Sequence, residues 1–86
     1  MAQVEIYTTP ICPYCLRAKQ YLERNGHSFN EIDVSRDPEQ RQVMMQRSGG
    51  HTLPQIFIND KSIGGCDDLF YLAHSGELEE LLGPQD

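Results

Sequence analysis

The sequence predicts an α/β fold in which one four-stranded mixed sheet is flanked by helices on both faces. Strand-like and helix-like runs follow one another in the order strand, helix, strand, helix, strand, strand, helix, helix. A connecting helix makes the first two strands parallel, whereas a tight turn makes the last two antiparallel. The 86 residues suffice for one small domain, which we expect to span residues 1–86.

The first strand is expected at Gln3–Thr8. Apolar Val4 and Ile6 alternate there with Glu5 and Tyr7. Because successive side chains of a strand point to opposite faces, each pair should lie on its own face of the sheet. The proline that follows ends the strand.

The first helix is expected from about Pro13 to Asn25. The helical period predicts an inner face of Cys15, Ala18 and Leu22 and an outer face of Arg17, Gln20 and Arg24. Asn25-Gly26 then supplies the left-handed residue with which many helices end.

The second strand is expected at Ser28–Val34, with Phe29 and Ile32 as its apolar anchors. Because a helix connects it to the first strand, the two should be parallel.

The second helix has a clear start signal. Asp37 is expected as its N-cap, Pro38 as its first residue and Gln40 as the partner of a capping box. Two apolar residues should form its buried side, Val43 and Met44. The glycine pair after Ser48 ends it.

The rest of the chain predicts two strands and two helices. The strands are Gln55–Asn59 and Lys61–Gly64, joined by a tight turn at Asn59-Asp60. The helices run from Asp67 to about His74 and from Glu77 to Leu82. Their apolar faces should consist of Leu69, Phe70 and Ala73, and of Leu78, Leu81 and Leu82.

Composition excludes several classes of function. The net charge of -6 argues against a nucleic-acid partner, which favours a basic surface. No apolar run is long enough to span a membrane, and no signal-peptide pattern precedes the first strand. An odd number of cysteines, three, argues against a disulfide-stapled extracellular scaffold. We therefore expect a soluble protein of the cytoplasm.

The chemistry of the chain is expected at Cys12-Pro13-Tyr14-Cys15, where a strand is followed by a helix. The nucleophilic form of cysteine is the thiolate, which the free N–H groups at a helix start stabilise. Pro13 suits the first helical position, and the N–H groups of Tyr14 and Cys15 are the expected donors to the Cys12 sulfur. Cys15 lies deeper and should have the higher pKa. Cys12 would therefore be the attacking thiol, and Cys15 would be the resolving thiol that displaces the group bound to Cys12.

Half of a zinc site is the alternative interpretation of this motif. The further ligands would have to come from Cys66, His27, His51 or His74. These four residues contain no second close pair, and Pro13 favours a helix start over a zinc knuckle. We expect no metal site.

Three separated motifs give the chain a resemblance to the dithiol glutaredoxins of the small bacterial type. They are Cys12-Pro13-Tyr14-Cys15, Thr52-Leu53-Pro54 and Gly64-Gly65-Cys66-Asp67-Asp68, and the resemblance extends from Val4 to about Leu82. It implies a thioredoxin-like fold. It also implies a cis peptide bond before Pro54, which turns the Leu53 backbone toward a bound peptide.

The resemblance further implies a glutathione-binding site. Helix-start N–H groups at Cys66 and Asp67, after flexible Gly65, would bind the γ-glutamyl carboxylate, and the Asp67 side chain would bind the ammonium group. Arg41 matches a position that faces the glycine carboxylate, and Tyr14 should lie alongside the ligand. In all, the implied binding residues are Tyr14, Arg41, Thr52, Leu53, Pro54, Gly65, Cys66 and Asp67. A lysine that many relatives have is replaced by Thr9.

The implied activity is glutathione-dependent reduction of protein disulfides and of protein–glutathione mixed disulfides, without a bound cofactor. Glutathione would be the co-substrate, and the implied protein partners include ribonucleotide reductase. A monomer is expected. Two rivals remain: a hydrogen donor fed by thioredoxin reductase, and a dimeric module that holds a [2Fe–2S] cluster. The glycine motif argues against the first and Pro13 against the second.

Overall fold

The computed structural model describes residues 3–83, so both ends of the domain expected at 1–86 lie outside the described residues. The elements are β1 (Val4–Thr8), α1 (Pro13–Arg24), β2 (Asn30–Asp33), α2 (Pro38–Ser48), β3 (Gln55–Ile58), β4 (Lys61–Gly64), α3 (Cys66–Ser75) and α4 (Glu77–Leu82). Their order is the predicted one, and each boundary lies within two residues of its expected position. Within residues 3–83, none of the helices combines the length and apolar character needed to cross a bilayer.

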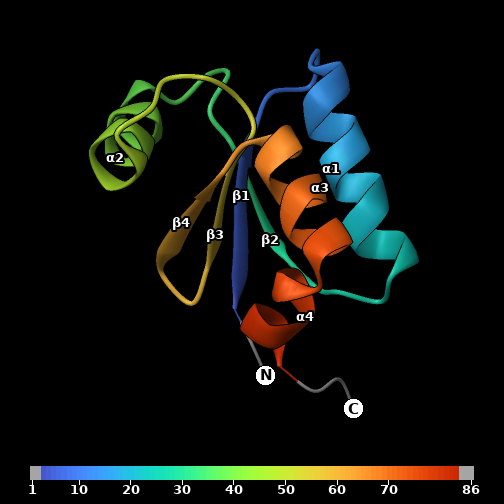
Figure 1. The fold of residues 1–86 in the computed structure, drawn as a ribbon. Coiled ribbons are helices and arrows are strands. Elements are labelled where there is room, and N and C mark those ends of the chain that lie inside the picture. The colour runs from blue at the N-terminus through green and yellow to red at the C-terminus, as the bar shows by residue number, and fades with distance from the viewer. Residues whose placement is uncertain (1–2, 84–86) are drawn as a thin grey trace.

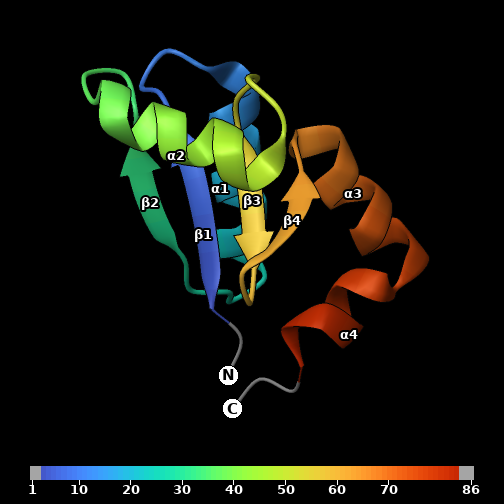
Figure 2. The ribbon, with the colours of Figure 1, turned by 90° about the vertical axis from the view of Figure 1, so that its left-hand side faces the viewer.

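The four strands form one mixed sheet in the order β2-β1-β3-β4. β1 pairs in parallel with β2 and antiparallel with β3, which pairs antiparallel with β4. Figures 1 and 2 show α1 and α3 on one face of this sheet and α2 on the other. The predicted fold class is therefore confirmed. The β3–β4 turn is also confirmed, because Asn59 and Asp60 have φ values of 51° and 67°, as a two-residue hairpin turn requires.

The larger core lies between the sheet and helices α1, α3 and α4. Its buried residues are Val4, Ile6, Ala18, Leu22, Ile56, Ile58, Cys66, Leu69, Leu78 and Leu82. The predicted inner face of α1 is confirmed by the burial of Cys15, Ala18 and Leu22. Phe70, Ala73 and Leu81 are partly buried against the same core. Because α1 and α3 share this core, the beginnings of both helices have fixed positions.

The smaller core lies on the opposite face, under α2. It consists of Tyr7, Val34, Met44 and Phe57. The prediction that Val43 belongs to the buried side of α2 is wrong, because Val43 is 39% exposed and Met45 packs against this core instead. Residues 43–45 are consecutive apolar residues about 100° apart around the helix, so only the middle one faces the sheet squarely. The flexible Met45 side chain reaches the core from one flank.

The start of α2 differs in one detail from its prediction. The Gln40 N–H donates to the Asp37 carboxylate at 3.1 Å, which confirms Asp37 as the N-cap. The Asp37 N–H, however, donates to the Val34 carbonyl at 3.4 Å. That donor is therefore not held by the Gln40 side chain, and the expected reciprocal capping box is replaced by a loop hydrogen bond.

A charged cluster ties the end of α2 to the sheet. The Arg47 guanidinium donates to the Tyr7 hydroxyl at 2.8 Å and to both Glu5 carboxylate oxygens at 3.0 and 3.3 Å. Its central carbon lies 4.0 Å from the Phe57 ring centre, and Asp60 adds an ion pair at 3.4 Å. Both Arg47 and Glu5 are only about a quarter exposed, so this bidentate pair is stronger than an ordinary surface ion pair.

Arg47→Met should lower the free energy of unfolding by about 1–3 kcal/mol, because the partly buried Glu5 and the buried Tyr7 lose their shared donor. Urea denaturation followed by circular dichroism measures the change. Arg36→Met, at an exposed loop position, is the matched control and should change stability by less than about 0.5 kcal/mol. Equal effects of the two substitutions would contradict the role given to this cluster.

Candidate active site

The three motifs singled out in the sequence meet at one end of the sheet, at the top of Figure 1, where β1 leads into α1 and β4 leads into α3. Cys12 is the N-cap of α1, with extended backbone angles of φ -128° and ψ 107°. Pro13 is the first residue of the helix, where its missing N–H leaves no bond unmade. The local sequence therefore fixes the Cys12 side chain over the first turn.

Two backbone groups contact the Cys12 sulfur. The Cys15 N–H donates to it at 3.2 Å, and the sulfur lies 3.8 Å from the Leu53 carbonyl oxygen, to which its thiol can donate. The sequence predicts the N–H groups of Tyr14 and Cys15 as donors to this sulfur, and the structure shows the hydrogen bond from Cys15. Cys12 is partly exposed, so a substrate sulfur can reach it.

Cys15 has a different environment. It is 1% exposed, and burial, followed by a hydrogen bond with the Cys12 side chain, raises its pKa to about 12. A backbone hydrogen bond from Thr9 and the positive charge of Lys19 act in the opposite direction. Burial of the deeper thiol thus raises its pKa, in the direction that the sequence predicts.

The loop before β3 forms the wall opposite Cys12. The Leu53–Pro54 peptide bond is cis, as the resemblance implied, and Pro54 is buried. The Gln55 side chain donates to the Thr52 carbonyl at 3.0 Å and to the Thr52 hydroxyl at 3.2 Å. Gln55 is 5% exposed, and sequence reasoning missed it as a support of this loop. Its only signal was a polar residue at the start of an otherwise apolar strand.

The first turn of α3 forms a third wall. Gly65 is its N-cap, and the Asp68 carboxylate accepts a hydrogen bond from the Gly65 N–H at 2.9 Å. Gly64 has a φ of +112°, and a Cβ added there would collide with the Asp68 side chain. Glycine is therefore required at that bend. The N–H groups of Cys66 and Asp67, the first two helical residues, have no partner within the helix by virtue of their position.

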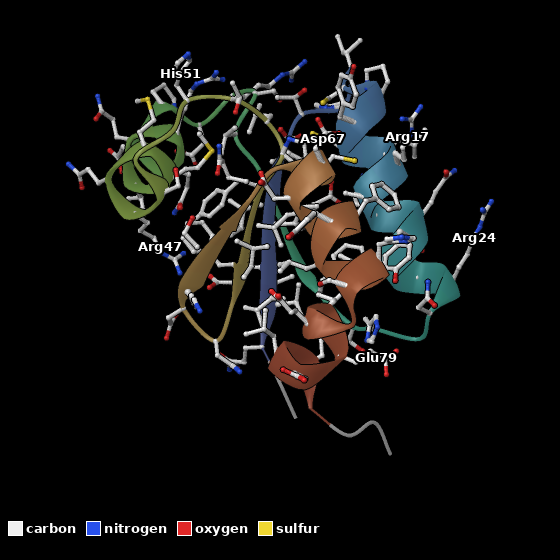
Figure 3. The ribbon with its side chains drawn as sticks, in the orientation of Figure 1. Arg17, Arg24, Arg47, His51, Asp67 and Glu79 are labelled. Carbon is white, nitrogen blue, oxygen red and sulfur yellow. The ribbon has the colours of Figure 1, made fainter. Side chains whose placement is uncertain are left out.

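These walls enclose a groove of about 230 Å³. It is lined by Tyr14, Thr52, Leu53, Pro54, Gly65, Cys66, Asp67 and Asp68. Asp67 is exposed, and Figure 3 shows it at the first turn of α3, near the start of α1. Cys12 lies beside the groove, because its sulfur is near Leu53. The structure thus brings together every binding residue expected from the resemblance except Arg41, and it adds Asp68.

Arg41 lies outside the lining of this groove. Its guanidinium donates to the His51 carbonyl at 3.5 Å, on the loop that continues into Thr52. It is therefore at the margin of the site. Tyr14 is 55% exposed, and the Arg17 guanidinium lies 5.9 Å from its ring centre.

Cys66, the third thiol, is 5% exposed, and burial raises its pKa. It lines the groove through its position at the start of α3. Among residues 3–83, no group of three or more histidine, cysteine or acidic side chains is placed so that it could hold a metal ion.

A mixed sheet with helices on both faces and a Cys-x-x-Cys pair at a helix start defines a thioredoxin-like dithiol protein. A sequence model described as glutaredoxin matches residues 4–63. Glutaredoxin 3 of Escherichia coli (strain K12) is 51% identical over 82 residues, which cover 95% of this chain and 99% of that protein. The chain belongs to the glutaredoxin family, and this membership implies thiol–disulfide oxidoreductase activity.

Solved structures agree with this assignment. The solution structure of glutaredoxin from Brucella melitensis is 56% identical, with a TM-score of 0.83, and the match covers 95% of this chain and 89% of that one. The crystal structure of a buckwheat glutaredoxin–glutathione complex is 27% identical, with a TM-score of 0.84 over 92% of this chain and 74% of that one.

Iodoacetamide should alkylate Cys12 at least about tenfold faster than Cys15 at neutral pH. Cys12 is accessible and accepts an N–H bond, whereas Cys15 is buried with a pKa of about 12. Mass spectrometry of tryptic peptides after timed quenching measures both rates. The rate at Cys15 should keep rising well above pH 9, where an ordinary thiol is already half ionised. Similar rates at the two cysteines would contradict the asymmetry of the site.

Proposed function

We propose that this protein reduces protein–glutathione mixed disulfides and protein disulfides with electrons from glutathione. The observation that carries this proposal is the position of the Cys12 sulfur. It lies beside a groove that offers peptide backbone at Leu53, helix-start N–H groups at Cys66 and Asp67, and a carboxylate at Asp67.

Glutathione is the ligand whose charges suit this groove. Its γ-glutamyl end carries a carboxylate, which the N–H groups of Cys66 and Asp67 can bind, and an ammonium group, which the Asp67 side chain can bind. The Leu53 backbone can pair with the extended tripeptide like a short strand. Tyr14, Thr52 and Gly65 line the space between. The bound ligand of the buckwheat glutaredoxin complex supports this choice.

Arg41 is assigned to the glycine end of the tripeptide. It already donates to the His51 carbonyl next to Thr52, which places its guanidinium beside the loop that lines the groove. Because Thr9 stands where many relatives have lysine, we assign the positive charge that faces this carboxylate to Arg41.

The glutathione route uses Cys12 alone. The Cys12 thiolate attacks the glutathione sulfur of a mixed disulfide, that S–S bond breaks, and the protein thiolate leaves and takes a proton from water. A second glutathione thiolate then attacks the glutathione sulfur bound to Cys12. Oxidised glutathione leaves, and the Cys12 thiolate is restored.

Protein disulfides need both cysteines. Cys12 attacks one sulfur of the target, and the Cys15 thiolate then attacks the Cys12 sulfur of the mixed disulfide. The target leaves as a dithiol, and two glutathione molecules reduce the Cys12–Cys15 bond. The family resemblance makes ribonucleotide reductase one such target. We propose that the protein catalyses these reductions as a monomer and without a bound cofactor. A reducing compartment such as the cytoplasm is the proposed location.

The direct test is steady-state reduction of a small glutathione mixed disulfide, coupled to glutathione reductase. Activity that depends on glutathione is the expected result. A parallel assay with thioredoxin reductase as the electron source should show little activity. The reverse pattern would identify a hydrogen donor of the thioredoxin-reductase type and overturn the proposal.

Cys15→Ser should keep activity on a glutathione mixed disulfide but lose most of its activity on a protein disulfide, because only the second reaction needs a resolving thiol. The two coupled assays measure this with the same enzyme preparation. Cys12→Ser is the control and should be inactive in both. Loss of both activities in Cys15→Ser would contradict the one-cysteine route.

Asp67→Asn should raise the KM for glutathione mixed disulfides roughly tenfold, because a charged hydrogen bond to the ammonium group is lost. The control is Glu79→Gln, which removes the same charge on α4 at the opposite end of the molecule (Figure 3). Thermal unfolding should be nearly unchanged in both variants. A KM that stays the same in Asp67→Asn would exclude this residue as the ammonium partner.

A further inference from the structure

A network of three side chains lies behind the active site, outside the groove. The Lys19 ammonium forms an ion pair with the Glu31 carboxylate at 2.8 Å, and the Thr8 hydroxyl donates to the same carboxylate oxygen at 2.7 Å. The network thereby joins α1, β2 and the last residue of β1. The Lys19 side chain is 22% exposed, and Thr8 is fully buried. The hydrogen bonds from Lys19 and Thr8 hold the Glu31 carboxylate in place and lower the pKa of that carboxyl.

Lys19 is placed to act on the resolving cysteine. It follows Cys15 by four residues on α1, so the two side chains share a face of the helix. Long helical side chains point back toward the helix N-terminus, which here is the direction of Cys15. The ion pair with Glu31 holds the Lys19 ammonium on this face of α1. The residue that follows Thr8, Thr9, contributes a backbone hydrogen bond to Cys15.

We propose that Lys19, held by Glu31 and Thr8, is a positioning residue that speeds the attack of Cys15 on a Cys12 mixed disulfide. This inference rests on the proposed function, because it concerns the resolving step of the two-cysteine route. In that step the Cys15 proton goes to water, the Cys15 thiolate forms a bond to the Cys12 sulfur, and the partner sulfur leaves with the electron pair of the broken disulfide.

The step needs such assistance because Cys15 is buried. Burial opposes the thiolate form, and the neighbouring Cys12 sulfur opposes it further while it carries charge. Once Cys12 is in a mixed disulfide, that sulfur is neutral. The Thr9 backbone hydrogen bond then favours a Cys15 thiolate most, and the positive charge of Lys19 favours it further. Lys19 should therefore matter for resolution and not for the first attack by Cys12.

Reaction with an excess of the chromogenic disulfide 5,5′-dithiobis(2-nitrobenzoate) separates the two steps. Cys12 attacks it and releases one coloured thiolate at a rate proportional to reagent concentration. Cys15 then attacks the Cys12 adduct and releases the second thiolate at a rate independent of that concentration. Stopped-flow absorbance resolves both phases.

Lys19→Met should slow the second phase by about threefold to tenfold, the size of effect expected for one nearby charge at a partly screened site. The first phase should be unchanged. Lys19→Arg keeps the charge and should restore most of the rate. Lys61→Met removes the only other lysine, exposed on β4, and should leave both phases as they are.

The outcomes discriminate clearly. Equal slowing of both phases by Lys19→Met, no slowing of the second phase, or failure of Lys19→Arg to restore it would overturn the role of Lys19. Cys15→Ser should lack the second phase. If that variant keeps it, the assignment of Cys15 as the resolving thiol fails, which is a failure of the proposed function and not of the Lys19 inference alone.

Discussion

The position at which α1 begins is the constraint on which the rest of the site depends. Because Cys12 is the N-cap, the Cys15 N–H meets its sulfur at 3.2 Å, while Cys15 itself is turned into the core. A single helix start thus gives two cysteines, separated by two residues, opposite environments. One is reachable and bonded to a backbone donor, and the other is buried with a pKa raised to about 12. The proposed order of reaction, in which Cys12 attacks first and Cys15 follows, depends on this difference.

Packing far from the sulfurs maintains this arrangement. The larger core holds α1 and α3 against the same face of the sheet, so the two helix starts lie on either side of one groove. On the other face, Arg47 fastens the end of α2 to Glu5 and Tyr7, and the chain leaves α2 from there toward Thr52 and Leu53. The buried Gln55 then fixes Thr52. The three loops that form the groove are therefore held by contacts on both faces of the sheet.

Much of this was predictable from the sequence, because turn residues, caps and periodicity are local signals. Asp37, Asn59-Asp60 and the inner face of α1 are examples. The cis bond before Pro54 came from family resemblance, since no local signal distinguishes it from a trans bond. What the sequence did not reveal depends on contacts between distant segments. Arg47 on Phe57 is one such contact.

Ambiguous periodicity explains the other differences. Three consecutive apolar residues in α2 left open which one faces the sheet, and the structure buries Met44 completely while exposing Val43. In the segment around β2, Phe29 packs against the larger core and Ile32 against the smaller, so a spacing of three residues reflects two faces and not an irregular strand. The role of Gln55 required knowledge of which loop lies beside it.

The order of the strands has a consequence for how this protein meets other chains. The outer strands, β2 and β4, are each four residues long and carry mostly exposed polar residues, among them Asn30, Glu31 and Lys61. Short, charged borders of this kind discourage foreign strands from extending a sheet. An unfolded or partly oxidised polypeptide therefore gains little by aligning along either flank. The Leu53 backbone, next to the Cys12 sulfur, is where the proposed function places the contact with a substrate chain.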